Sequence, residues 1–204
     1  MDLFSQENTD IEVFKVLDGE ILFIRNFLSP TESEKYYEVL LKTINWKQEQ
    51  ISFYGKTYPV PRKTAWYGNE DLNYSYSGIK CCPETWTEEL LKIKAAIEEL
   101  IPPEIFTSVL MNLYNDGNDK MGWHADDEKE LGVNPTIASL SIGETRRFDL
   151  KHKTNKDLHY KFELTSGSLL IMKGALQHHW VHQIPVQKKV KNPRINLTFR
   201  TIKK

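Results

Sequence analysis

The 204-residue sequence has little cysteine, no long apolar run and almost no net charge, and each shortage excludes a class of protein. Its two cysteines, Cys81 and Cys82, are adjacent, which argues against a disulfide framework and predicts a reduced, intracellular setting. No stretch approaches the roughly 20 apolar residues of a membrane span, and "MDLFSQENTD" lacks a signal-peptide core, so we expect no membrane association. With a formal net charge of −1, any nucleic-acid contact would need a local basic patch.

Internal repeats and low-complexity linkers are also missing, so we predict one domain over residues 1–204. Residues 11–28 read as two short strands around Asp18-Gly19. Ser29, with Pro30 and Glu32 behind it, is typical of a capped helix start. Residues 51–61 predict a hairpin that turns near Gly55 and Lys56, and a second helix is expected from near Pro83 to "IPPE". The expected buried helix faces are Tyr37, Leu40, Leu41 and Ile44, and Trp86, Leu90, Ile93 and Ile97.

After Pro103 the pattern changes to short β-like runs separated by turn residues. Seven such runs follow, from "TSVLMNLY" to "RINLTFRTI". Many short strands after two helices favour an α+β fold in which helices pack outside a sandwich or barrel of jelly-roll type. The sequence therefore divides into an N-terminal part of about residues 1–104 and a jelly-roll core of about residues 105–204.

The stretch "GWHADDEKE", residues 122–130, places His124 two residues before Asp126. With six histidines and 28 acidic residues in the chain, about 0.8 such triplets are expected by chance, so the motif alone is weak. "LQHHWVHQIP" offers a third ligand: in a strand, His178, Trp180 and His182 would share one face and His179 the other. Two histidines and one carboxylate on a β scaffold form the facial triad of non-haem iron, although zinc accepts the same set.

The last β-like run, "PRINLTFR", places polar side chains at every second position, hence on one face. They are Arg194, Asn196, Thr198 and Arg200. A buried guanidinium is costly without a partner. Two readings remain open at this point: two internal ion pairs, or a dicarboxylate ligand gripped by planar guanidinium forks.

Taken in order, Asn-x-Tyr at 112–114, His-x-Asp at 124–126, His182 and Arg-x-Asn-x-Thr-x-Arg at 194–200 resemble the AlkB family. Its members are iron(II)- and 2-oxoglutarate-dependent dioxygenases that demethylate nucleic-acid bases. The resemblance covers about residues 50–203 and implies a double-stranded β-helix. It also implies that iron(II) is held by His124, Asp126 and His182. The residues implied for 2-oxoglutarate are Asn112, Tyr114, Arg194, Asn196, Thr198 and Arg200.

The implied chemistry is hydroxylation of an N-methyl carbon, which then leaves as formaldehyde. Three protein ligands leave positions on iron for 2-oxoglutarate and dioxygen. The metal carries the difficult step, which fits the absence of a nucleophile motif. The implied substrates are 1-methyladenine and 3-methylcytosine in DNA. The same chemistry on RNA or protein, and a non-catalytic metal-containing nucleic-acid-binding module, remain alternatives, and a monomer is expected.

"VPRKTAWYGNEDLNYSYSG", residues 60–78, further resembles the homologues that repair duplex DNA. A target base must leave the stack, so aromatic pocket walls are expected, and the resemblance implies Trp66, Tyr74 and Tyr76 for them. Aromatic strand residues are as often core, which holds for Trp66 and for the neighbouring Tyr67. Asp127 and Glu128 are implied to contact the exocyclic amine of the cationic base, the alternative being solvated loop acids.

Base flipping also leaves a gap that an apolar or aromatic wedge can fill. The hairpin tip at Phe53 and Tyr54 is the candidate, since large aromatics beside a tip glycine are unusual unless they bind something. Phosphate contacts are implied for Arg62 and for the basic loop with Lys188 and Lys189. The alternative for that loop is an ordinary solvated charge run.

Overall fold

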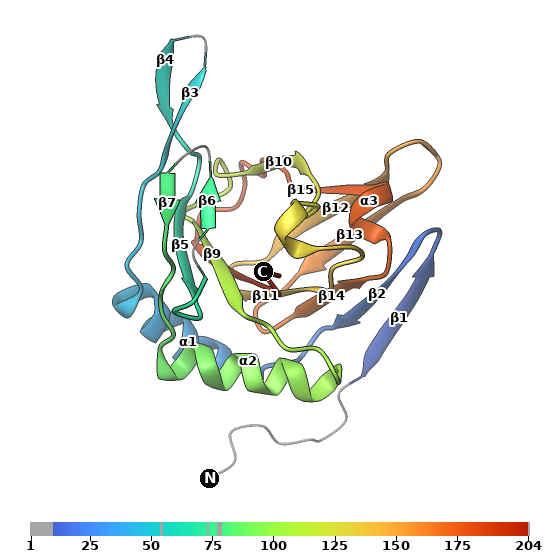
Figure 1. Ribbon diagram of the computed structural model, residues 1–204, viewed down its shortest axis with the longest axis horizontal. Coiled ribbons are helices and arrows are strands. Elements are labelled where there is room, and N and C mark those ends of the chain that lie inside the picture. The colour runs from blue at the N-terminus through green and yellow to red at the C-terminus, as the bar shows by residue number, and fades with distance from the viewer. Residues whose placement is uncertain (1–9, 54, 73, 77–78, 204) are drawn as a thin grey trace.

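The computed structural model describes residues 10–53, 55–72, 74–76 and 79–203, and two facing β-sheets dominate it (Figure 1). The larger sheet of the described chain has the order β1-β2-β14-β11-β16-β9-β5-β8. Its strands are β1 (Ile11–Val16), β2 (Gly19–Ile24), β14 (Leu169–Lys173), β11 (Ile137–Gly143), β16 (Arg194–Arg200), β9 (Ser108–Tyr114), β5 (Lys63–Gly68) and β8 (Glu84–Thr85). All of its pairings are antiparallel except that of β5 with β8.

The smaller sheet faces it with the order β10-β15-β12-β13. Its strands are β10 (Met121–His124), β15 (Trp180–Ile184), β12 (Arg146–His152) and β13 (His159–Leu164). Two separate hairpins are formed by β3 (Gln50–Phe53) with β4 (Lys56–Pro59) and by β6 (Tyr74–Tyr76) with β7 (Ile79–Cys81). The helices are α1 (Pro30–Thr43), α2 (Glu88–Leu100), the 3-10 turn η1 (Lys129–Leu131) and the short α3 (Leu176–His179). The expected jelly-roll with outer helices is confirmed.

The larger sheet separates two apolar cores. Its outer face packs on α1 and α2, with Leu40, Ile93 and Phe199 among the fully buried side chains. Its inner face packs on the smaller sheet through a second cluster that includes Phe148 and Trp180. Alternation along β16 links the two sides: Ile195, Leu197 and Phe199 join the helix-side core, which directs the polar positions of the strand between the sheets. Among the described residues, none of the helices is both long and apolar enough for a membrane span.

The first helix begins as the sequence predicts. Ser29 is its N-cap, the Ser29 backbone N–H donates to the Glu32 carboxylate at 2.8 Å, and Ser29 Oγ accepts from the Glu32 backbone. The buried face was predicted only in part: Leu40 and Ile44 are buried, but Leu41 is 37% exposed and Tyr37 only half-buried. The stripe runs through Ser33, Tyr36 and Leu40 instead. Ser33 lies against the Gly167 turn: its Oγ is 2.6 Å from the position that a Cβ at residue 167 would take, so the contact requires glycine at 167.

Replacement of Ser29 by alanine is expected to destabilise the protein by about 1 kcal/mol. The substitution removes the acceptor for an orphan N–H of the first turn and leaves Glu32 without its hydroxyl partner. Urea unfolding followed by circular dichroism measures the change. Ser29→Asp, which keeps a side-chain acceptor at the cap, should retain most of the stability; equal losses in the two variants would contradict the capping role.

Two other boundaries differ from expectation. The second helix begins at Glu88 with Thr87 as N-cap, and not near Pro83, because Glu84–Thr85 form β8 beside β5. Leu90, Ile93 and Ile97 are buried as predicted, but Trp86 lies before the helix and stacks on Phe199. In "LQHHWVHQIP", residues 176–179 form α3 and the strand starts only at Trp180.

Candidate metal centre

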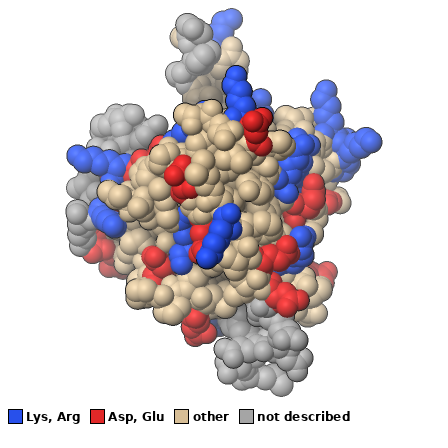
Figure 2. Space-filling view, turned by 90° about the vertical axis from the view of Figure 1, so that its right-hand side faces the viewer, with Lys and Arg blue, Asp and Glu red and all other residues tan. Residues whose placement is uncertain are grey.

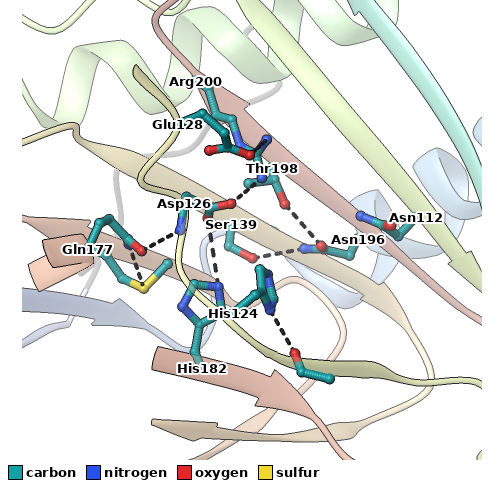
Figure 3. Close-up of polar contacts among 12 residues, drawn as sticks. Asn112, His124, Asp126, Glu128, Ser139, Gln177, His182, Asn196, Thr198 and Arg200 are labelled. Atoms are coloured by element: carbon teal, nitrogen blue, oxygen red, sulfur yellow. Dashed lines mark hydrogen bonds and ion pairs between the residues drawn. The ribbon is translucent and has the colours of Figure 1, made fainter. Parts of the chain in front are cut away.

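Three side chains with metal-ligand chemistry meet between the two sheets. His124 ends β10 and lies directly opposite His182 on the antiparallel strand β15, while Asp126 follows two residues after His124. The two imidazole centroids are 4.2 Å apart, and His182 Nε2 lies 3.7 Å from Asp126 Oδ2 (Figure 3). One ligand atom from each residue lies within 4.8 Å of the others. The sequence-predicted triad is therefore assembled, although its residues are up to 58 positions apart in the chain.

Burial and neighbouring charges set the protonation of two members of the triad, His182 and Asp126. His182 is 4% exposed and Asp126 2% exposed. Burial lowers the pKa of His182 to about 3, against the opposing attraction of Asp126, so its imidazole is neutral at pH 7. Burial by itself raises the pKa of Asp126, but Arg200, His182 and His124 outweigh it, so the pKa lies below its usual value. The His182 imidazole and the Asp126 carboxylate are thus in the forms that bind a divalent metal such as iron(II).

Contacts outside the triad set the orientation of each ligand. His124 Nδ1 lies 2.8 Å from the Gly122 carbonyl, which can only accept, so Nδ1 carries the proton and Nε2 is free to coordinate. Asp126 is ion-paired with Arg200 through its carboxylate. The ring of His182 stacks on Phe148 with centroids 5.1 Å apart. These contacts direct the donor atoms of the three residues toward one point.

A pocket of about 510 Å³, which includes the open solvent at its mouth, lies beside the triad. The described residues that line it include Arg62, Asn112, Tyr114, His124, Asp126, Phe148, Met172, His182, Arg194, Asn196, Thr198 and Arg200. All six residues that the resemblance implies for 2-oxoglutarate are among them. The alternation of β16 and its pairing with β9 place these side chains on one wall.

Arg194 is the unusual member of this wall. It is 1% exposed, donates from Nη2 to Ser141 Oγ at 2.8 Å and lies 5.3 Å from the ring of Tyr114. Its Nε and Nη1 have no hydrogen-bond partner in the described part of the chain. Burial lowers its pKa to about 10, which still leaves it cationic at pH 7. A buried cation with unused N–H groups on a pocket wall fits a carboxylate ligand.

The two arginines of the polar strand differ in their partners. Arg200 pairs with Asp126 and lies 3.9 Å from Glu128, which is an internal ion pair. Arg194 forms no ion pair with a carboxylate of the described residues. A dicarboxylate would supply the partner that Arg194 lacks.

The amides on this wall are already engaged. Asn196 donates from Nδ2 to Ser139 Oγ at 2.8 Å and accepts from Thr198 Oγ1 at 3.1 Å. Asn112 Oδ1 accepts from Arg62 Nε at 2.6 Å. These bonds hold the pocket wall in shape, and they turn Arg62, expected at a phosphate, into the pocket beside the triad.

The remaining residues implied for substrate contact are more dispersed. Trp66 is half-buried and pairs across the strands with Leu110, which lines the pocket, whereas Tyr67 is core, as the alternative reading had it. The Asp127 carboxylate accepts from Lys153 Nζ at 3.3 Å, and the Glu128 carboxylate lies near Arg200. Both acids are exposed, outside the described pocket wall.

The hairpin and the basic loop lie at the periphery. The β3-β4 hairpin projects from the body (Figure 1), but Tyr54 and the side chains of Phe53, Tyr74 and Tyr76 are outside the described residues. Lys188 and Lys189 are exposed. Lys and Arg are interspersed with Asp and Glu on the face shown in Figure 2. Binding of a polyanion such as a nucleic acid would therefore require a local cluster of basic residues.

A second group of two histidines and one aspartate lies elsewhere in the described chain, but hydrogen bonds already occupy the ring nitrogens of one of its histidines. Asp18, His152 and His179 bring possible ligand atoms within 4.8 Å of one another. His152 Nδ1, however, accepts from the backbone N–H groups of Thr154 and Asn155 at 3.3 and 3.0 Å. Its proton therefore lies on Nε2, which is 3.2 Å from the Asp18 carboxylate and donates to it. The group is a hydrogen-bonded cluster that joins the β1-β2 turn to β12.

A triad of two histidines and one aspartate between jelly-roll sheets, with an arginine-lined pocket beside it, defines the class of non-haem iron oxygenases. The family described as "2OG-Fe(II) oxygenase superfamily" matches residues 20–200. The chain belongs to this superfamily and, within it, to the AlkB homologues.

The relatives that support this assignment match most of the chain. It is 43% identical over 185 residues to "Alpha-ketoglutarate-dependent dioxygenase alkB homolog 3" of Mus musculus, which covers 86% of the chain and 64% of the relative. It is 35% identical over 181 residues to "DNA oxidative demethylase ALKBH2" of Mus musculus, covering 84% and 75%. The solved "structure of OsALKBH1" aligns with a TM-score of 0.63 at 20% identity over 89% of this chain and 97% of that chain. The chain thus spans slightly less than two thirds of the alkB homolog 3 relative.

Proposed function

We propose that the protein is an iron(II)- and 2-oxoglutarate-dependent dioxygenase that removes methyl groups from 1-methyladenine and 3-methylcytosine in DNA. The observation that carries the proposal is the buried Arg194, whose Nε and Nη1 have no hydrogen-bond partner among the described residues, on a pocket wall beside the His124–Asp126–His182 triad. A structural metal site would have no use for such a cation. The printed name of one relative, "DNA oxidative demethylase", supports the choice of substrate.

Each part of the site has a proposed role. His124, Asp126 and His182 would hold iron(II), which together with 2-oxoglutarate and dioxygen supplies the oxidation of the N-methyl carbon. Arg194 would bind one carboxylate of 2-oxoglutarate, and Arg200 would bind the cosubstrate or orient Asp126. The cosubstrate wall would be completed by Asn112, Tyr114, Asn196 and Thr198.

The side chains around the triad would exclude water from the reaction and admit only a base that has been flipped out of the duplex. The apolar part of the pocket is formed by Leu110, Met121, Phe148, Met172 and Ile184. We propose that Trp66, with Tyr74 and Tyr76, stacks on the flipped base. The exposed acids Asp127 and Glu128 would attract a cationic methylated base after breaking their pairs with Lys153 and Arg200. Arg62, bonded to Asn112, would link the cosubstrate wall to the nucleotide.

The periphery would hold the strand around that base. Phe53 and Tyr54 at the tip of the projecting hairpin would fill the gap in the stack. Lys188 and Lys189 would contact phosphates. We propose further that residues 1–204 act as one catalytic domain, as a monomer inside the cell; the entry of β1, β2 and β5 into the larger sheet supports a single unit.

Turnover on matched oligonucleotides tests this proposal. Single-stranded DNA, duplex DNA and RNA, each with one 1-methyladenine, are incubated with iron(II), 2-oxoglutarate and oxygen, and base mass and formaldehyde are followed. Demethylation of DNA with an equal yield of formaldehyde is expected. Replacement of both Phe53 and Tyr54 by alanine should lower activity on the duplex more than on the single strand. Turnover on RNA alone, with metal bound, would reject DNA as the substrate.

A further inference from the structure

Gln177 is a completely buried polar residue next to the triad that no motif marks. It lies on α3, the four-residue helix between β14 and β15. Its side-chain Oε1 accepts a hydrogen bond of 2.9 Å from the backbone N–H of Asp126, 51 residues earlier in the chain (Figure 3). Its Nε2 lies 3.4 Å from Met172 Sδ. A buried glutamine that bonds the backbone of a metal ligand is placed to control that ligand.

The position of Asp126 in the fold explains why it needs such a partner. The pairing of β10 with β15 ends at His124, so Asp126 lies beyond the strand ladder. Its backbone N–H has to find another acceptor, because a buried unpaired N–H costs about 1–3 kcal/mol. Only the carbonyl oxygen of the Gln177 amide can accept it, so the orientation of that amide is determined.

The carboxylate of Asp126 is attracted by the guanidinium of Arg200, on another side of the residue. Arg200 is ion-paired with Asp126 at the opposite end of the side chain from the Gln177 bond. A carboxylate held only by a charge would follow the guanidinium away from the two histidines. With the backbone bonded to Gln177, it stays where Oδ2 lies 3.7 Å from His182 Nε2. The bond therefore acts on the geometry of the triad and not only on the stability of the fold.

A second contact reinforces the first from the same helix. Lys153 lies just after β12. Its Nζ donates to the backbone carbonyl of Gln177 at 3.2 Å and to the Asp127 carboxylate at 3.3 Å. Its backbone N–H also donates to the His179 carbonyl at 2.7 Å. Two consecutive residues after β10 are thus held in place: Asp126 by Gln177 of α3, and Asp127 by Lys153, which is itself bonded to α3.

We propose that Gln177 is a positioning residue that orients the Asp126 carboxylate toward the metal, with Lys153 as a weaker support. The inference rests on the proposed metal centre and does not depend on the substrate. Groups that orient metal ligands commonly change metal affinity about 10- to 100-fold when they are removed. An effect of this size is measurable with the metal alone.

The experiment is a calorimetric titration of the protein with Co(II), a divalent ion that takes the same ligands and reports their geometry in its visible absorption. Gln177→Met keeps the length and apolar volume but removes the acceptor, and about 10- to 100-fold weaker binding is expected. Gln177→Glu restores an acceptor oxygen, and its protonated form is nearly isosteric with glutamine. Affinity and spectrum close to those of the unaltered protein are expected for it.

The matched control is Gln187→Met. The half-buried Gln187 also accepts from a backbone N–H, that of Arg147 at 2.8 Å, but it contacts none of the three ligands. Loss of stability without loss of Co(II) affinity is expected there. Should Gln177→Met fail to fold, Lys153→Met, at a partly exposed position, replaces it, with about two- to fivefold weaker Co(II) binding expected.

The outcomes separate this inference from the proposed function. Unaltered Co(II) affinity and spectrum in Gln177→Met, or in Lys153→Met where that variant stands in, would overturn it. So would equal losses in Gln177→Met and Gln187→Met, or no binding of Co(II) by the unaltered protein. The inference would survive a protein that binds Co(II) as expected but does not demethylate DNA, whereas the proposed function would not.

Discussion

Replacement of His182 by alanine is expected to abolish turnover, with a loss of at least ~1,000-fold, because metal stabilisation of a reaction is worth several kcal/mol. His182 is one of the three ligand side chains that the described residues bring together at the centre, and it is 4% exposed. Apart from His124, no other histidine of the described chain lines the pocket. Formaldehyde release measures the loss of activity, and Co(II) titration measures the loss of metal.

The natural control lies four residues earlier. His178→Ala removes a histidine from the same stretch, but His178 is exposed on α3, where its Nε2 accepts from the Asn134 backbone. Activity and Co(II) affinity should stay within about twofold of the unaltered protein, as for most surface substitutions. Full activity in His182→Ala, or a comparable collapse in His178→Ala, would show that the ligand has been assigned to the wrong histidine.

This pair also shows how far the sequence determines the site. Within the strand, period-two alternation is enough to predict that His182 faces inward, and Trp180, His182 and Ile184 are indeed buried in turn. The same rule fails for His178, because residues 176–179 form a helical turn and not a strand. A run of four residues is too short for helical periodicity to appear against the strand pattern.

The polar strand was predictable for a related reason. Arg194, Asn196 and Thr198 alternate with three apolar residues, so one face of β16 had to be polar whatever covered it. Which arginine is paired internally could not be predicted, since it depends on Asp126, which lies 74 positions from Arg200. Pairing between remote loops leaves no local pattern in a sequence.

Gln177 illustrates the limit most clearly. The residue occupies the stretch that supplied the third ligand, yet a single buried glutamine has neither a periodicity nor a motif. Its importance follows only from the closure of α3 over the end of β10. The helix face through Ser33 was missed for the same kind of reason, because the fit to Gly167 is a contact across 134 residues.

Replacement of Arg194 by methionine is expected to weaken the apparent affinity for 2-oxoglutarate by about 2–5 kcal/mol, roughly 30- to 5,000-fold, with kcat less affected at saturation. The cause is the loss of a desolvated guanidinium whose Nε and Nη1 have no hydrogen-bond partner in the part of the chain that the structure describes. Calorimetry with 2-oxoglutarate and the Co(II)-loaded protein measures it. Arg147→Met, which removes a partly exposed arginine paired with Asp149, should leave this affinity unchanged.

The same substitution is expected to leave the ligand-free fold as stable as before, or more stable. Arg194 is buried as a cation without a carboxylate partner among the described residues, and replacing such a charge by a well-packed apolar side chain is commonly neutral or stabilising. Urea unfolding without 2-oxoglutarate tests this. A large loss of stability together with unchanged affinity would mean that Arg194 serves the fold. Retained stability with lost affinity would mean that the fold tolerates this cation because a dicarboxylate neutralises it.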